Sequence, residues 1–167
     1  ATSLYIAAQK GHKEVVSLLL SKGAEPDKAK SNGVTSLYIA AAKGHKEVVS
    51  LLLSHGADAN YDKGSAHSPL HLAAKSGNVD VFKFLLEKGA IFTLKLTDDL
   101  IRSYSPSMQA YLNPRRAWTA LHFSVEVNNL PVVRSLLDNG ADPDDANGSG
   151  YAPIYLAPKA DSDEMFK

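Results

Sequence analysis

The chain repeats itself at a fixed interval of 33 residues. Residues 2–21 read TSLYIAAQKGHKEVVSLLLS and residues 35–54 read TSLYIAAAKGHKEVVSLLLS, so 19 of 20 positions are identical. Related stretches begin 33 residues further on at Ser68, then after 51 residues at Thr119, and after another 33 at Ala152. The step of 51 exceeds the period by 18, which places one insertion between the third and fourth copies. A period of this length predicts stacked units, each too small to bury its apolar side alone.

We therefore expect one array of five units rather than several domains. The units span about residues 2–34, 35–67, 68–118, 119–151 and 152–167, with the insertion at about residues 93–114. The fifth unit is truncated before a Leu-Leu pair, and Pro158 falls inside its first helix, where proline disrupts a regular helix. Because the first unit is nearly identical to the second, its outer face resembles an internal one. This pattern predicts an array that is cut at both ends or ends in a frayed cap.

Within each unit, the apolar residues predict two short helices. In the first copy, Leu4 and Ala7 lie on one side of the first helix, and Val16 and Leu20 form the i, i+4 stripe of the second. A hydroxyl residue that can cap the first helix precedes it at Thr2, Thr35, Ser68 and Thr119. Residues that tolerate positive φ separate the two helices at Gly11, Gly44, Gly77 and Asn128. Glycine follows the second helix at Gly23, Gly56, Gly89 and Gly140.

This pattern resembles the ankyrin repeat over nearly the whole chain. The T-P-L-H-x-A core is present at residues 68–73 as SPLHLA and, more weakly, at residues 119–124 as TALHFS. The chain departs from the family at Tyr5, Tyr38 and Tyr155 in place of histidine, and at Ser3 and Ser36 in place of proline. The resemblance implies an all-α ankyrin-repeat solenoid of stacked helix-turn-helix units with projecting hairpin-like loops. Its concave side would be formed by loop tips and first helices.

Composition excludes several classes of function. Eighteen basic residues balance 18 acidic ones, so no global field attracts nucleic acid or an anionic membrane, and the charges form no basic stripe along the chain. The chain has no cysteine, which excludes disulfides and thiol catalysis and suits a reducing compartment. No apolar run approaches the roughly 20 residues of a membrane-spanning helix, and the sequence at Ala1 does not resemble a signal peptide. We expect a cytoplasmic monomer that binds neither nucleic acid nor membrane.

The residues also give no reason to expect catalysis, a cofactor or a metal. The six histidines include no H-x-x-x-H pair and no cluster with carboxylates at ligand spacing. The resemblance implies structural roles for them: local hydrogen bonding for His12 and His45, and bridging between loop backbones for His71 and His122. Asp98-Asp99 fits the first turn of a helix, where carboxylates favour the helix dipole. We expect no enzyme in these residues.

The insertion carries the residue types that anchor protein interfaces. Thr97 could cap a short helix through Ser103, and Ser105 followed by Pro106 predicts a second helix over residues 107–112. Tyrosine, tryptophan, methionine and arginine are enriched at interfaces, and here they are Tyr104, Met108, Tyr111, Arg115, Arg116 and Trp118. Two interpretations stay open: a contact surface for a partner, or a satellite core that pins the loop to the array.

The resemblance also implies where a partner would bind. The family's variable positions, at the loop tips and on the solvent side of the first helices, correspond here to a set that includes Ala29, Ser31, Asn32, His67, Lys75, Trp118, Glu126 and Tyr151. Asn60 matches a loop asparagine that can be hydroxylated in ankyrin-like proteins, with a plain loop-capping role as the favoured alternative.

The function predicted is a protein–protein interaction module or scaffold that binds a partner protein through its concave face and the inserted loop. Two alternatives remain open. The chain could be the substrate-recognition or targeting segment of a larger enzyme, such as a bacterial effector secreted into host cells and acting in the host cytosol. It could also be a structural spacer, although a spacer needs no aromatic-rich insertion.

Overall fold

The computed structural model describes residues 2–61, 68–92, 98–115, 118–147 and 150–156. These residues form α-helices and short 3-10 helices, and none of the described residues is in a β-strand. The helices are α1 (Ser3–Lys10), α2 (Lys13–Ser21), α3 (Ser36–Lys43), α4 (Lys46–Ser54), α5 (Pro69–Lys75), α6 (Val79–Glu87), α7 (Asp98–Arg102), α8 (Pro106–Leu112), η1 (Asn113–Arg115), α9 (Ala120–Glu126), α10 (Leu130–Asp138) and η2 (Pro153–Leu156).

The first helix of a unit begins where a hydroxyl side chain caps it. The Tyr5 N–H donates to Thr2 Oγ1 at 3.1 Å, the Tyr38 N–H to Thr35 Oγ1 at 3.2 Å, and the His71 N–H to Ser68 Oγ at 3.4 Å. Each bond satisfies one of the N–H groups that the first turn leaves without a helical partner. At Thr119 the arrangement differs, because Thr119 N–H donates to the Nδ1 atom of His122 at 3.2 Å.

The sharp turn between the two helices requires residues that accept a left-handed backbone. Gly11 has φ +74°, and Asn128 takes the same role in the fourth unit with φ +53°. Gly11 is also needed for space, since a Cβ atom there would lie 2.7 Å from the Nδ1 atom of His45. Both the conformation and the close approach of the next unit therefore select glycine at this turn.

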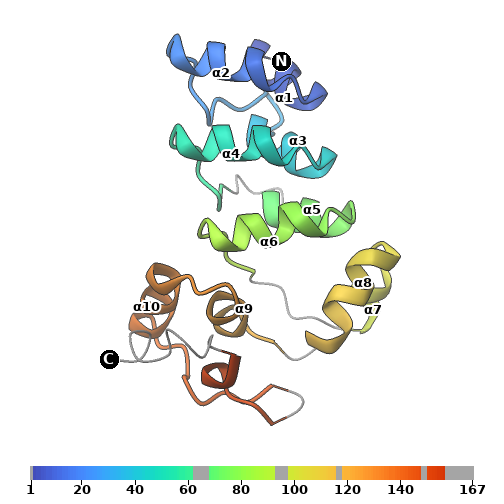
Figure 1. The fold of residues 1–167 in the computed structure, drawn as a ribbon, viewed down its shortest axis with the longest axis vertical. Helices are drawn as coiled ribbons and strands as arrows, with labels where there is room; N and C mark the ends of the chain where they lie inside the picture. Colours follow the sequence, from blue (N-terminus) through green and yellow to red (C-terminus); the bar gives the residue numbers. More distant parts are fainter. Residues whose placement is uncertain (1, 62–67, 93–97, 116–117, 148–149, 157–167) are drawn as a thin grey trace. The chain divides into compact units, whose positions relative to one another are not determined.

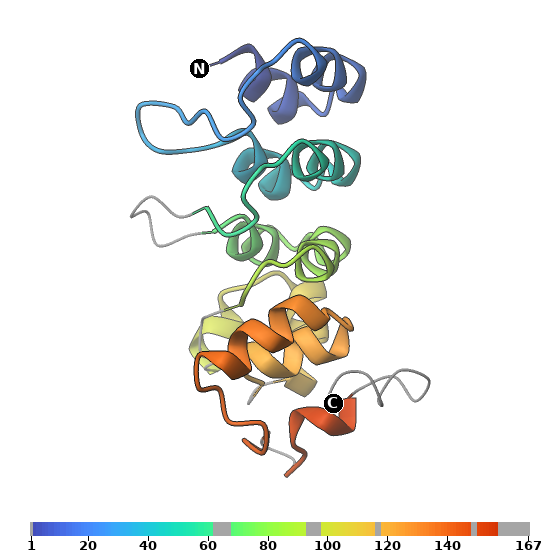
Figure 2. The same ribbon diagram turned by 90° about the vertical axis from the view of Figure 1, so that its left-hand side faces the viewer.

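The chain divides into two compact units, residues 1–85 and residues 86–167. In the first, helix pairs stack in series: α1 packs on α3, α3 on α5, and α2 on α4 (Figure 1). Seen end-on, α1, α3 and α5 form one column and α2, α4 and α6 another, and the connection between α2 and α3 extends beyond the first-helix column (Figure 2). The core between them includes Leu37, Leu52 and Leu70, which are completely buried.

The residues before α4 and α6 tie these helices to carbonyl groups of the preceding repeat. His45 Nε2 lies 3.2 Å from the Gln9 carbonyl oxygen, and Asn78 Nδ2 donates to the carbonyl oxygens of Ala41 and Ala42 at 3.1 Å. These partners lie at the C-terminal ends of α1 and α3, where carbonyl groups lack helical partners. The expectation of a local hydrogen bond for His45 is therefore wrong, because the bond crosses to the preceding repeat.

The second compact unit contains α9 packed on α10, with η2 against α9. Leu121, Val125 and Val133 form its buried cluster. Asn129, equivalent in sequence to Asn78, donates from Nδ2 to the carbonyl oxygens of Leu86 and Glu87 at 3.0 and 2.9 Å. The equivalent side chain therefore binds the end of the second helix of the preceding repeat here, α6, instead of the end of its first helix.

The inserted segment folds into the two helices that its sequence predicts, with shifted ends. Helix α7 begins at Asp98 and ends at Arg102, one residue before the expected Ser103. Helix α8 begins at Pro106, and Ser105 Oγ accepts from the Met108 N–H at 3.4 Å. The helical conformation does not end at Asn113-Pro114, because the 3-10 helix η1 follows α8 directly and continues through Arg115. A short 3-10 helix is common at the end of an α-helix. Thr97, the expected cap of α7, lies outside the described residues.

At the start of the fifth repeat, the described residues form the short 3-10 helix η2, in which the Tyr155 N–H donates to the Ala152 carbonyl oxygen at 3.1 Å. Pro158 and the rest of the expected truncated helix pair lie outside the described residues.

Candidate interaction surfaces

Four of the predicted interface residues form one cluster on the inserted segment and α9. The Arg115 guanidinium pairs with both carboxylate oxygens of Glu126, through Nε to Oε2 at 3.2 Å and through Nη2 to Oε1. Its Nη1 donates to the Tyr111 carbonyl oxygen at 2.6 Å. The guanidinium carbon also lies 4.0 Å from the centre of the Tyr111 ring and 4.8 Å from that of the Trp118 ring. We call these four residues the Arg115 clasp.

Partial burial strengthens the clasp electrostatically. The side chains of Arg115 and Glu126 are only 18% and 26% exposed, so water screens their attraction less than it screens a surface pair. The Tyr111 hydroxyl donates to Glu126 Oε2 at 3.0 Å. Burial raises the pKa of Tyr111, the Glu126 charge raises it further, and Arg115 opposes the rise. Tyr111 therefore stays a neutral hydrogen-bond donor, and the clasp joins η1 and α8 to α9.

The Trp118 ring of the clasp also packs against the side chains of His122 and Phe123 in α9. The Trp118 and His122 rings stack with centroids 5.9 Å apart, and the Trp118 ring meets that of Phe123 edge-on at 5.2 Å. His122 is buried, with Nδ1 2.9 Å from Thr119 Oγ1 and Nε2 3.2 Å from the Tyr151 carbonyl oxygen. This histidine bridges neighbouring backbones as the family resemblance implied.

The other predicted residues of the insertion fall into two groups. Tyr104 and Met108 are buried together with Ile101 and Leu112, which is the satellite core of the packing interpretation. They have little surface to offer a partner while the segment is folded. Arg116 lies outside the described residues, as does His67 of the third unit. The sequence could not separate these roles, because the residue types that anchor interfaces also fill small cores.

A polar hollow lies among the loop tips of the first compact unit. Its volume is about 560 Å³, and its lining consists of Asp27, Ala29, Lys30, Ser31, Asn32, Gly33 and Tyr61. The tip is a tight hairpin in which Lys30 N–H donates to the Val34 carbonyl oxygen at 2.9 Å and Gly33 N–H to that of Lys30 at 2.8 Å. We call it the tip hollow. Tyr61 comes from the next connection along the chain and was not among the predicted binding residues.

Asp27 links the two connections that form the tip hollow. Its carboxylate accepts the Asp58 N–H at 3.0 Å on Oδ2 and 3.2 Å on Oδ1. Burial raises the pKa of Asp27, the backbone hydrogen bond from Asp58 lowers it, and the Asp58 charge raises it again. Lys30 Nζ lies 4.7 Å from the centre of the Tyr5 ring, so the tip is also held to the first helix column. The tip hollow is therefore lined by one acidic and one basic side chain, on a loop that hydrogen bonds hold in place.

The remaining predicted residues are exposed at separate places. Lys75 ends α5, and Asn60 lies at the loop turn, where its N–H donates to Asp58 Oδ1 at 2.8 Å. Tyr151 is 54% exposed, and its ring meets that of Tyr155 edge-on with centroids 5.7 Å apart.

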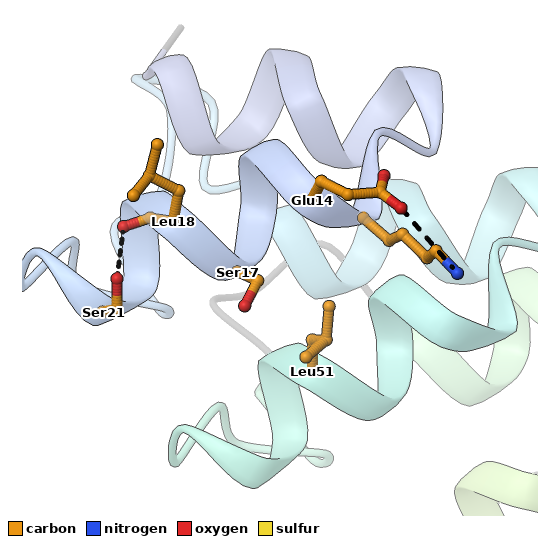
Figure 3. A pocket seen from close by; sticks show the side chains of 6 residues that line it. Glu14, Ser17, Leu18, Ser21 and Leu51 are labelled. Atoms are coloured by element: carbon orange, nitrogen blue, oxygen red, sulfur yellow. Dashed lines mark hydrogen bonds and ion pairs between the residues drawn. The ribbon is translucent and has the colours of Figure 1, made fainter.

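A second hollow lies between α2 and α4. Its volume is about 510 Å³, and five of its six lining residues come from α2, with Leu51 from α4 (Figure 3). Lys13 and Glu14 pair at 3.8 Å on one side, while Ser21 Oγ donates to the Leu18 carbonyl oxygen at 2.8 Å. Ser21, Lys13 and Glu14 already have partners within α2. The exposed Leu18 side chain is the main apolar group that this hollow offers to a ligand.

The described residues hold no group of three or more histidine, cysteine or acidic side chains that could bind a metal ion. Within the same residues, no helix has both the length and the apolar character needed to cross a membrane.

Comparison with known protein families gives two matches. A model of ankyrin repeats in three copies matches residues 4–98, and a model of a single ankyrin repeat matches residues 117–148. The first match alone covers more than half of the chain. The residues between the two matches, 99–116, include α8, η1 and all of α7 except Asp98, so nearly all of the inserted helices lies outside the matched repeats.

Proposed function

The chain belongs to the ankyrin repeat family, and on that premise we propose that it binds a partner protein through the tip hollow and the neighbouring first helices. Ankyrin repeats are generally non-catalytic modules for protein–protein interaction. The observation that supports this site is the polar lining of the tip hollow by two consecutive connections, with Asp27, Lys30 and Tyr61 around it.

The tip hollow suits recognition of a polar or charged side chain. Asp27 and Lys30 offer opposite charges, and Ser31 and Asn32 offer hydroxyl and amide groups that can donate and accept. The hairpin bonds at Lys30 and Gly33 hold the tip before a partner arrives, so little ordering entropy is lost on binding. A partner that buries charged groups there gains specificity through complementary pairing.

The inserted segment would supply a second contact. The Arg115 clasp fixes α8 and η1 to α9, so their outer side forms a rigid surface instead of a mobile loop. Tyr111 and Trp118 are half-buried and therefore still partly exposed. Tyrosine and tryptophan are among the residue types that most often contribute most of the binding energy at an interface.

One matched pair of substitutions tests the tip hollow. Ser31→Trp would fill it, whereas Ser50→Trp places the same bulk on an exposed position of α4. With the native chain as bait in lysate from cells that make it, we expect Ser31→Trp to reduce capture of the specific partner at least about tenfold, a loss of 1.4 kcal/mol. Ser50→Trp should capture as the native chain does. Equal capture by both variants, or no specific partner for the native chain, contradicts the proposal.

A separate replacement tests the insertion. Exchanging residues 94–114 for a standard short tip removes α7, α8 and most of η1 but keeps the repeat pattern on either side. We expect weaker binding to the partner captured above, measured by titration calorimetry. Unchanged affinity would mean that the insertion only packs against α9, and the tip hollow would then be the whole site.

A further inference from the structure

The tip hollow contains a carboxylate that can still accept hydrogen bonds. Asp27 lines the hollow, and its carboxylate accepts the Asp58 N–H at 3.0 Å on Oδ2 and 3.2 Å on Oδ1. Since a carboxylate has about four lone-pair positions, each oxygen keeps one for a further donor. Within the described part of the chain, no lysine or arginine forms an ion pair with Asp27.

The charges around this carboxylate favour an incoming cation. The Asp58 carboxylate adds a second negative charge that acts on Asp27 and contributes to its raised pKa. The two nearest lysines in the sequence are engaged elsewhere: Lys28 Nζ lies 3.7 Å from Glu25 Oε1, and Lys30 Nζ lies over an aromatic ring of α1. The ion pair adds no net charge. Among the described residues, two carboxylates therefore outnumber one lysine at the hollow, and the local net charge is negative.

An aromatic side chain belongs to the same lining as the carboxylate. Tyr61 reaches the hollow from the connection after α4, and it is half-buried, so part of it stays exposed. A cation placed over a tyrosine ring is attracted by the negative face of the ring. The same loop already makes such a contact, because Lys30 Nζ lies 4.7 Å from the centre of the Tyr5 ring. The hollow therefore offers both a carboxylate and an aromatic ring to one incoming group.

Arginine is the cationic side chain that best matches this lining. Its guanidinium group is planar, pairs with a carboxylate through two parallel N–H donors and stacks flat on an aromatic ring. It has five N–H donors and no acceptor. The Ser31 hydroxyl can accept from the remaining donors, and so can Asn32 Oδ1, which accepts the Val34 N–H at 3.4 Å. The small residues Ala29 and Gly33 complete the lining and leave the hollow open.

We propose that the tip hollow binds an arginine side chain of the partner protein, with the guanidinium group on the Asp27 carboxylate and over the Tyr61 ring. This inference rests on the proposed function, because it names the chemistry that the hollow recognises in that partner. The charges of Asp27 and Asp58 disfavour a carboxylate or phosphate group there. A lysine side chain would pair with Asp27 as a point charge, without flat stacking on Tyr61.

Titration with single amino-acid analogues tests this recognition directly. Acetyl-arginine-amide is added to the isotope-labelled full chain at neutral pH, and the backbone amide resonances are followed by NMR. We expect saturable shifts that are largest at residues 27–33, Asp58 and Tyr61, with a dissociation constant in the millimolar range that one side chain can reach. Acetyl-citrulline-amide has nearly the same shape without the charge, so it should bind at least about tenfold more weakly. Acetyl-lysine-amide with an unmodified side chain should bind more weakly than the arginine analogue.

Two substitutions separate the two contacts of the guanidinium group. Asp27→Asn removes the charge but keeps an oxygen atom for the Asp58 N–H, and Tyr61→Leu removes the ring but keeps an apolar side chain. Each should weaken binding of the arginine analogue about threefold or more. Tyr61→Phe keeps the ring and should retain binding. Asp144→Asn, at the position equivalent to Asp27 after α10, is the matched control and should bind as the native chain does.

Absence of saturable shifts with the arginine analogue overturns the inference, as does equal binding of the citrulline analogue. Stronger binding of acetyl-glutamate-amide overturns it as well, because the hollow would then recognise an anion. The capture experiment with Ser31→Trp judges the proposed function separately. If Ser31→Trp reduces capture but the arginine analogue does not bind, only the choice of arginine is wrong. If the analogue binds but Ser31→Trp and Ser50→Trp capture equally, only the use of the hollow for the partner is wrong.

Discussion

The surroundings of Asp27, a loop residue, shift the pKa of its carboxyl group in opposite directions. Its carboxylate accepts the Asp58 N–H, which favours the charged form, yet burial and the Asp58 charge favour the neutral one. The net result is a raised pKa. The folded chain therefore holds this proton to higher pH than the unfolded chain does. Stability falls as pH rises through the window from the ordinary carboxylate value of about 4 up to the raised value.

The substitution Asp27→Asn should remove this decrease in folding stability with rising pH. Asparagine keeps an Oδ1 atom that can accept the Asp58 N–H but has no charge to bury, and Asn60 is the natural residue at the equivalent position of the next unit. We expect the urea midpoint of the variant, relative to that of the native chain, to increase as pH rises from 3 to 7. Asp144→Asn, at the equivalent exposed position after α10, serves as the matched control. A difference at Asp27 that does not change with pH would contradict the prediction.

At the scale of elements, the inserted helices depend on the Arg115 clasp for their attachment to α9. The Arg115–Glu126 pair is partly buried and bidentate, and Arg115 also stacks on Tyr111. A double-mutant cycle with Arg115→Ala and Glu126→Ala should give a coupling free energy of unfolding of about 1–3 kcal/mol. Loss of one partner leaves the other without its charge in a poorly screened place.

The same segment supplies the control for that cycle. Arg102 and Asp99 of α7 pair at 3.3 Å, but their side chains are 72% and 94% exposed. A cycle with Arg102→Ala and Asp99→Ala should give no more than about 1 kcal/mol, since water screens exposed pairs. Equal coupling in the two cycles, measured by urea unfolding, would mean that burial of the clasp contributes nothing.

The helices themselves were predictable from local chemistry. The caps at Thr2, Thr35 and Ser68 and the left-handed residue Asn128 lie where the sequence predicts them, because caps and tight turns depend on a few adjacent residues. At the start of the fifth repeat the described residues form only the short helix η2, and Pro158, which the sequence predicts to disrupt the first helix of this repeat, lies outside them. A helix of so few residues depends on its packing more than on its own propensity.

The roles of the binding candidates were not predictable in the same way. Tyr104 is buried and Tyr111 belongs to the clasp, although both are tyrosines in one short segment. The position of Tyr111 depends on its hydrogen bond to Glu126 of α9, which is distant in sequence. The same holds for His45 and Asn78, whose partners lie 36 or 37 residues earlier in the chain. Residue type indicates what a side chain can bind, and the stacking of units decides what it does bind.

At the scale of the whole molecule, each of the two compact units contains fully buried side chains. Leu52 of α4 is fully buried in the first, and Met108 of α8 is fully buried in the second. Stability in a repeat array is approximately a sum of unit and nearest-neighbour terms, so damage should spread mainly to adjacent elements. Truncating a buried Leu or Met to alanine costs about 2–5 kcal/mol.

Native-state hydrogen exchange can detect this separation. We expect Leu52→Ala to accelerate exchange of backbone amides in α1 to α5 more than in α9 and α10, and Met108→Ala to accelerate it in α8 and α9 more than in α1 to α3. Each variant is the control for the other, because both remove a fully buried side chain from a helix. Uniform acceleration along the chain in either variant would mean that the described helices open as one cooperative body, and nearest-neighbour additivity would then fail for this array.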